Sequence, residues 1–256
     1  MRTASHPFLD RPAPLAFAHR GGAADGLENT HRAFERAVGL GYRYLETDVH
    51  LTADGVLVAF HDATLDRVTD GSGPIAGLSW AEVARARVGG SEPVPRLADL
   101  LRAFPAARWN LDVKAEAALR PLLAELDRLD AWDRVCVGSF TEARVARARA
   151  WAGPRLATSL GTRGVVGLRL RSLGVPGRGP ARGAVCAQVP VRQSGVPVVD
   201  RRFVAAAHRA GLQVHVWTVN DRRRMIDLLR LGVDGIMTDK IETLREVLEE
   251  RGAWRG

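Results

Sequence analysis

Residues 44–62, YLETDVHLTADGVLVAFHD, contain the pattern that decides the fold. Glu46 and Asp48 are two residues apart, so on an extended strand both carboxylates point to the same face. Asp54-Gly55 favours a tight hairpin turn, after which an apolar run returns the chain and brings His61 near the two acids. Like charges on one strand face repel each other unless a cation lies between them. The stretch therefore predicts a strand and a hairpin that carry a cation site or, as the plainer interpretation, solvated surface acids.

Apolar, strand-like runs recur along the whole chain, and most are followed by a segment with helical spacing. The expected strands are centred near residues 16, 46, 111, 136, 157, 186, 216 and 236. Repeated strand–helix units with right-handed crossovers give a parallel sheet, and eight such units close into a TIM (β/α)8 barrel. The hairpin and a loop-rich insertion follow the second strand. The competing fold, a doubly wound open sheet, is disfavoured because no glycine-rich dinucleotide fingerprint opens a strand–helix unit.

Length and local signals complete the expected architecture. The 256 residues suit one barrel domain that spans residues 1–256. Asn29 is expected to cap the helix that follows the first strand. Residues 161–183 are rich in glycine and arginine and contain two prolines, so a broken helix and a loop are expected there.

Charge and hydropathy limit the classes of function. The 37 lysines and arginines outnumber the 29 aspartates and glutamates, which gives a formal net charge of +8. Only Lys114 and Lys240 are lysines. The arginines are scattered over helix-like segments, with neither a basic tail nor zinc-finger spacing, so a nucleic-acid partner is disfavoured. No apolar run approaches the roughly 20 residues of a membrane span, so no integral membrane segment is expected. Without a secretory h-region, and with Cys136 and Cys186 expected as buried free thiols, the sequence predicts a cytoplasmic protein.

Polar side chains stand where expected strands end. His19 and Arg20 follow the first apolar run, and Asn110, Asp112 and Lys114 alternate along one face of the third expected strand. The carboxyl ends of barrel strands are where TIM-barrel chemistry takes place, and polar groups on a barrel face are costly unless they are partnered. Because almost every other basic residue of the chain is an arginine, Lys114 suggests that a compact point charge is needed at this position. These residues therefore favour a functional site.

The ordered motifs of the chain resemble those of the glycerophosphodiester phosphodiesterase family. They run from residue 19 to residue 239 and comprise His19-Arg20-Gly21, Glu28-Asn29-Thr30, Glu46-x-Asp48, His61-Asp62, Asn110-x-Asp112-x-Lys114, Ser139-Phe140, the segment 216–220 and the segment 232–239. The resemblance implies a TIM barrel that hydrolyses glycerophosphodiesters with a divalent metal ion, calcium or magnesium.

The resemblance also implies roles for individual positions. His19 and His61 match the catalytic pair, and Arg20 and Lys114 match residues that hold the phosphate. Glu46, Asp48 and Asp112 match metal ligands. Asp112 stands where the family usually has a glutamate, so its side chain is one methylene shorter. All-oxygen ligands suit calcium or magnesium on chemical grounds as well. Trp217, near the end of a late strand, is either a substrate-stacking residue or a core tryptophan.

The expected reaction is metal-dependent hydrolysis to glycerol 3-phosphate and an alcohol, in which the two histidines share the proton transfers. Water and the glycerol 2-hydroxyl remain alternative nucleophiles. A lysophospholipase D-like activity on lysophospholipids is the nearest alternative function, with an apolar groove supplied by residues 161–180. A catalytically silent phosphate-binding barrel is the alternative from another class. The expected partner is a small-molecule glycerophosphodiester, and the sequence leaves the oligomeric state open.

Overall fold

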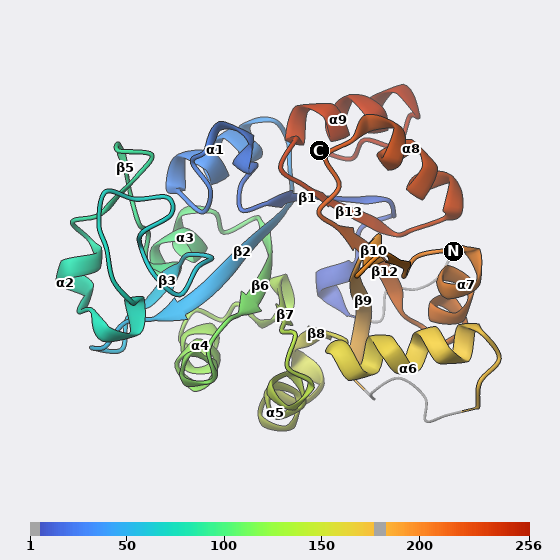
Figure 1. Cartoon of the computed structure of the whole chain (residues 1–256), viewed down its shortest axis with the longest axis horizontal. Helices are drawn as coiled ribbons and strands as arrows, with labels where there is room; N and C mark the ends of the chain where they lie inside the picture. The colour runs from blue at the N-terminus through green and yellow to red at the C-terminus, as the bar shows by residue number, and fades with distance from the viewer. Residues whose placement is uncertain (1–5, 177–182) are drawn as a thin grey trace.

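A closed barrel of parallel strands forms the centre of the molecule (Figure 1). The computed structural model describes residues 6–176 and 183–256. The barrel strands are β1 (Leu15–His19), β2 (Tyr44–Leu51), β6 (Arg108–Val113), β7 (Val135–Gly138), β8 (Ala157–Ser159), β9 (Ala184–Pro190), β12 (Gln213–Trp217) and β13 (Gly235–Thr238). They pair in this order, and β1 pairs in parallel with both β2 and β13, which closes the barrel. The predicted TIM barrel is confirmed, with each strand at its expected place.

The predicted hairpin and insertion after β2 are also present. Strand β3 (Leu57–Ala59) pairs antiparallel with β2, with Val49 opposite Ala59. The insertion contains η3 (Ile75–Gly77), α2 (Trp80–Val83), β4 (Arg87–Val88) and β5 (Glu92–Pro93). It buries a small apolar cluster of its own, so the loop that follows His61 is held in a fixed shape.

Helices surround the barrel and bury their apolar faces against it. They are α1 (His31–Gly39), α3 (Leu97–Ala103), α4 (Glu116–Arg128), α5 (Glu142–Ala152), α6 (Thr162–Ser172), α7 (Arg201–Arg209), α8 (Arg222–Leu231) and α9 (Ile241–Glu250). The remaining short elements are η1 (Pro7–Leu9), η2 (Ala23–Asp25), η4 (Trp132–Arg134), η5 (Gly153–Arg155), β10 (Arg192–Gln193) and β11 (Val196–Pro197). Every helix in the described part of the chain is too short or too polar to cross a bilayer.

A second apolar cluster joins the N-terminal segment to side chains of the barrel strands. It contains Phe8 and Leu9 of η1 together with Tyr44, and the Tyr44 hydroxyl donates a hydrogen bond of 2.7 Å to the Phe8 carbonyl. Cys136 and Cys186 belong to the same cluster and are buried free thiols, as expected.

Two local expectations are wrong. Thr30, not Asn29, caps α1, because its hydroxyl accepts the Ala33 N–H at 3.2 Å, while Asn29 adopts a left-handed φ of 61°. The broken helix expected within residues 161–183 is an unbroken α6 over its first half. Gly161, just before α6, serves close packing, because a Cβ there would stand 2.7 Å from the Cα of Glu142 at the start of α5. Residues 177–182 of that segment lie outside the described residues.

The turn after β1 depends on Gly21, and we expect Gly21→Ala to lower the free energy of unfolding by at least about 2 kcal/mol. Gly21 has a φ of 82°, and an added Cβ would stand 2.8–2.9 Å from atoms of Ala33 and Phe34. Gly26→Ala is the matched control, because Gly26 has a φ of 81° but open space around it. Urea unfolding of both variants measures the difference, and equal midpoints would show that the close approach to α1 contributes nothing.

Candidate active site

The predicted site residues lie together at the carboxyl ends of the strands. Parallel pairing puts His19 opposite Glu46 on neighbouring β1 and β2, and Asp48 opposite Asp112 on neighbouring β2 and β6. A cavity of about 460 Å³ opens at this end of the barrel. Its walls include all the sequence-predicted site residues: His19, Arg20, Glu46, Asp48, His61, Asp112, Lys114 and Trp217.

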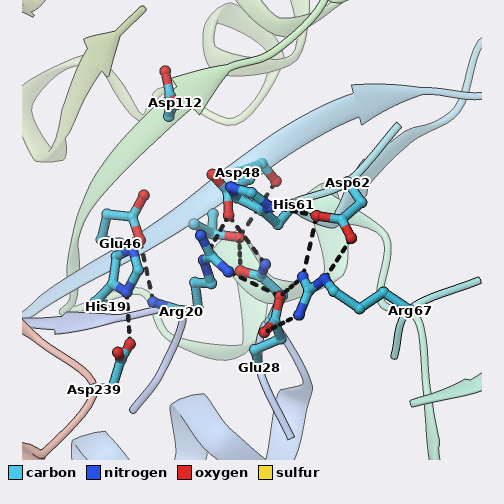
Figure 2. Close-up of polar contacts among 12 residues, drawn as sticks. His19, Arg20, Glu28, Glu46, Asp48, His61, Asp62, Arg67, Asp112 and Asp239 are labelled. Atoms are coloured by element: carbon cyan, nitrogen blue, oxygen red, sulfur yellow. Dashed lines mark hydrogen bonds and ion pairs between the residues drawn. The ribbon is translucent and has the colours of Figure 1, made fainter. Parts of the chain in front are cut away.

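His19 is held by a carboxylate on its far side (Figure 2). Its Nδ1 lies 2.6 Å from Asp239 Oδ1, and because a carboxylate only accepts, this nitrogen is the donor. The other nitrogen, Nε2, lies 3.7 Å from Glu46 Oε2. Burial lowers the pKa of His19, but the charges of Glu46 and Asp239 outweigh it, so the pKa is raised.

His61 follows β3 and has the same kind of support (Figure 2). Its Nδ1 lies 2.5 Å from Asp62 Oδ1, and Arg67 Nε donates to the other oxygen of Asp62 at 2.5 Å. The hydrogen bond from Arg67, together with that from His61, lowers the pKa of Asp62 to about 2. Arg67 also donates to both oxygens of Glu28, at 2.7 and 3.1 Å. Each histidine therefore has its Nδ1 fixed by a carboxylate, which leaves Nε2 for a substrate.

Two carboxylates are buried beneath the histidines. Glu46 is 4% exposed and Asp48 is 2% exposed. Burial and the charge of Asp48 raise the pKa of Glu46 to about 7. Burial acts the same way on Asp48, but Lys114 and Arg20 outweigh it and lower the pKa. Asp48 also accepts a hydrogen bond of 3.2 Å from Asn29 Nδ2, so Asn29, the predicted helix cap, instead orients a carboxylate of the site.

The two cations of the site contact these carboxylates. Lys114 Nζ lies 2.7 Å from both Asp48 Oδ1 and Asp112 Oδ2, and so bridges β2 and β6. Arg20 Nη1 donates to Glu28 Oε1 at 3.0 Å. Arg20 Nε lies 3.2 Å from Asp48 Oδ2 but is a buried donor without a hydrogen-bond partner among the described residues. Both positive charges line the cavity, where a phosphate oxygen can meet them.

One wall of the cavity is apolar. Trp217, at the end of β12, packs edge-on against Phe140 with ring centroids 5.7 Å apart. Val165, Val166 and Leu170 of α6 continue this wall. The cavity therefore combines an apolar side with a charged floor, by which we mean Arg20, Lys114 and the carboxylates Glu46, Asp48 and Asp112.

Known proteins share both the sequence and the fold. A sequence profile of the glycerophosphoryl diester phosphodiesterase family matches residues 19–243. The chain belongs to this family. A relative from Mycobacterium tuberculosis, named "Probable glycerophosphodiester phosphodiesterase 2", is 42% identical over 97% of this chain and 96% of its own length.

Solved structures share the family's barrel. A crystal structure from Silicibacter pomeroyi superimposes with a TM-score of 0.80 at 24% identity and covers 98% of both chains. An Oleispira antarctica phosphodiesterase, solved with the product sn-glycerol-3-phosphate, superimposes with a TM-score of 0.77 at 24% identity and covers 93% of this chain and 97% of its own. These two structural superpositions show that the chain has the TIM-barrel fold.

The carboxylates of this family member suit a hard cation by their chemistry. Glu46, Asp48 and Asp112 offer only oxygen donors, and burial and the charge of Asp48 raise the pKa of Glu46. Lys114, however, contacts two of the three, and within residues 6–176 and 183–256 no three His, Cys, Asp or Glu side chains already stand in a metal-binding arrangement. A calcium or magnesium ion held by all three carboxylates would therefore share Asp48 and Asp112 with Lys114 or displace its ammonium group.

The residues that support the histidines are not predicted by the sequence motifs. Asp239 lies in the segment 232–239, which by itself indicates no contact with His19. Asn220 orients it, since Asn220 Nδ2 donates to Asp239 Oδ2 at 2.7 Å and Asn220 Oδ1 accepts the Asp239 N–H at 2.9 Å. Arg67 lies outside these motifs. The available signal was position: Asp239 follows the last strand, which closes the barrel beside β1 and His19.

We expect Asp239→Asn to lower kcat by about 10- to 100-fold, because the amide offers an N–H as well as an oxygen and no longer fixes the His19 tautomer. Steady-state kinetics on a glycerophosphodiester measures the effect. Asp227→Asn is the control, since that carboxylate is exposed on α8 and lies 3.8 Å from Arg230 Nη1. An Asp239→Asn enzyme as fast as the Asp227→Asn enzyme would remove Asp239 from the support of His19.

Proposed function

We propose that this protein hydrolyses glycerophosphodiesters to glycerol 3-phosphate and an alcohol, with His19 and His61 as the acid–base pair. The observation that carries the proposal is their matched geometry: both line one cavity, and each has its Nδ1 fixed by a carboxylate. The family match and the product-bound relative support the substrate class.

The charged floor binds the phosphate in this proposal. The Arg20 guanidinium lines the cavity, and Lys114 offers a compact positive charge there. Both stabilise negative charge that builds up on the phosphoryl oxygens in the transition state. Glu46, Asp48 and Asp112 would hold a calcium or magnesium ion, which when bound adds further neutralisation of that charge.

The histidines divide the proton transfers. One Nε2 takes the proton of the attacking hydroxyl as its oxygen bonds to phosphorus, and the other Nε2 gives a proton to the alcohol oxygen as its bond to phosphorus breaks. The same two transfers serve either water or the glycerol 2-hydroxyl as the nucleophile. With the 2-hydroxyl, a cyclic phosphate forms first and water then opens it.

The test is a substrate comparison with purified protein in calcium or magnesium. Glycerophosphocholine and glycerophosphoethanolamine are expected to be hydrolysed, and the His19→Ala/His61→Ala double variant is expected to be inactive on both. A wild-type protein that binds glycerol 3-phosphate but hydrolyses no phosphodiester would instead support the silent phosphate-binding barrel.

A lysophospholipase D-like activity is the second candidate, and the apolar cavity wall favours it. Val165, Val166 and Leu170 lie on the segment from which the groove was expected, beside Phe140 and Trp217. An acyl chain would bury apolar surface there at roughly 25 cal/mol per Å². Comparing kcat/KM for lysophosphatidylcholine and glycerophosphocholine decides between the substrates, and a higher value for the lysolipid would make it the preferred one.

A further inference from the structure

Helix α6 is oriented differently from α4 and α5, the two helices before it. Figure 1 shows α4 and α5 nearly end-on, whereas α6 lies across the view beside β8 and β9. Leu168 is the one fully buried side chain within this described helix. By contrast, Val166 and Leu170 are 52% and 45% exposed, and Leu173, just beyond the helix end, is 51% exposed. Positions 166, 170 and 173 lie on one helical face, so they form an exposed apolar stripe.

Two further exposed apolar side chains lie near this stripe. Phe140, in the turn after β7, is 59% exposed, and Val196, in the β10–β11 hairpin, is 63% exposed. Phe140, Val166 and Leu170 line the active-site cavity, as does Gln193, which pairs with Val196 across the hairpin. We call Phe140, Val166, Leu170, Leu173 and Val196 the apolar rim. Large apolar side chains that gather at one cavity mouth mark an interaction surface rather than random exposure.

Positive charge accompanies the apolar rim. Helix α6 carries Arg163, Arg169 and Arg171 and no acidic residue, and Arg192 lies in the β10–β11 hairpin. Asp200 balances Arg169 at 2.7 Å. Arg163 and Arg192 are exposed beside the rim. A second copy of the chain would bring the same positive charge and be repelled, whereas an anionic lipid surface offers phosphates to the arginines and an apolar layer to the rim.

We propose that the apolar rim, with Arg163 and Arg192, docks the mouth of the active-site cavity onto an anionic lipid surface. The rim side chains would enter the boundary between headgroups and acyl chains, and the arginines would contact lipid phosphates. The proposal rests on the proposed function in one respect: a docked mouth faces a layer whose headgroups carry the phosphodiester that the cavity recognises.

Vesicle co-sedimentation tests the docking. The full-length protein is mixed with phosphatidylcholine vesicles that contain either no phosphatidylglycerol or about one-third of it. We expect binding to the anionic vesicles, weakened at least about tenfold by Leu173→Asp or Val196→Asp and about fivefold by Arg163→Gln or Arg192→Gln. High salt should weaken wild-type binding further. Leu173 and Val196 do not line the cavity, so turnover of soluble glycerophosphocholine should stay unchanged in both.

Trp151→Asp is the matched control. Trp151 is 50% exposed near the end of α5, which leads back to the opposite end of the barrel, so its change should leave vesicle binding intact. Wild-type binding by Leu173→Asp and Val196→Asp, or no wild-type binding to anionic vesicles, would overturn the docking proposal. So would a dimer in sedimentation velocity that Leu173→Asp dissociates, because a second copy would then cover the rim. A wild type that does not hydrolyse glycerophosphocholine would instead contradict the proposed function. The vesicle assay would still decide the docking proposal, because it measures binding and not turnover.

Discussion

Replacing either His19 or His61 with alanine is expected to lower kcat by about 10²- to 10⁴-fold, because each would remove one proton transfer from the proposed reaction. The Nε2 atoms are the acting groups, since Asp239 and Asp62 engage both Nδ1 atoms. The double variant should be little slower than either single variant, because residues that act in one step show strongly non-additive effects. Stopped assays on a glycerophosphodiester, with circular dichroism to confirm folding, measure both results.

His208→Ala is the matched control for these variants. His208 also pairs with an aspartate, through Nε2 at 2.7 Å from Asp234 Oδ2, but it lies on α7, away from the active-site cavity. It should keep wild-type turnover. A His19→Ala or His61→Ala enzyme with turnover close to that of His208→Ala would remove the substituted histidine from the mechanism.

Removing divalent ions is expected to abolish activity, and calcium or magnesium should restore it. The buried Glu46 and Asp48 carboxylates share a strand face, and the raised pKa of Glu46 reflects a charge that a cation would stabilise. Activity is measured after dialysis against excess EDTA and again after each ion is added back. Undiminished turnover in EDTA would contradict the proposed metal dependence.

Asp112 allows a sharper test of the ion. Asp112→Asn should lose most of the metal affinity, measured by calorimetry, whereas Asp112→Glu should keep activity but change the preference between calcium and magnesium, because the longer acid alters the shell. Glu116→Gln is the control, since that carboxylate lies near Asp112 in sequence but contacts Arg144 and Arg147. Wild-type affinity in Asp112→Asn and an unchanged preference in Asp112→Glu would remove Asp112 from the metal site.

The barrel and the membership of the site could be predicted because both follow from local patterns. Apolar runs of strand length, separated by helical spacing, specify the strands, and parallel strands bring their carboxyl ends to one end of a barrel. His19 ends β1, Asp112 is one residue before the end of β6, and parallel pairing puts Glu46 opposite His19, so their meeting needs no knowledge of side-chain packing.

The partners of these residues could not be predicted, because they depend on contacts between distant parts of the chain. Asp239 meets His19 across 220 positions, through the pairing that closes the barrel. Arg67 reaches Asp62 and Glu28 from a loop whose shape depends on the insertion's own apolar cluster. The glycines of α6 suggested a broken helix, yet Gly161 and Gly164 allow close contact with Glu142 instead. Composition alone does not distinguish these two uses of glycine.

Phosphorus NMR of the products formed from glycerophosphocholine tests the central claim most directly. The proposed roles of His19 and His61 predict glycerol 3-phosphate and choline as products of the wild type and of His208→Ala, but not of the His19→Ala/His61→Ala variant. Phosphocholine and glycerol as products, or unchanged product formation in the double histidine variant, would contradict the account.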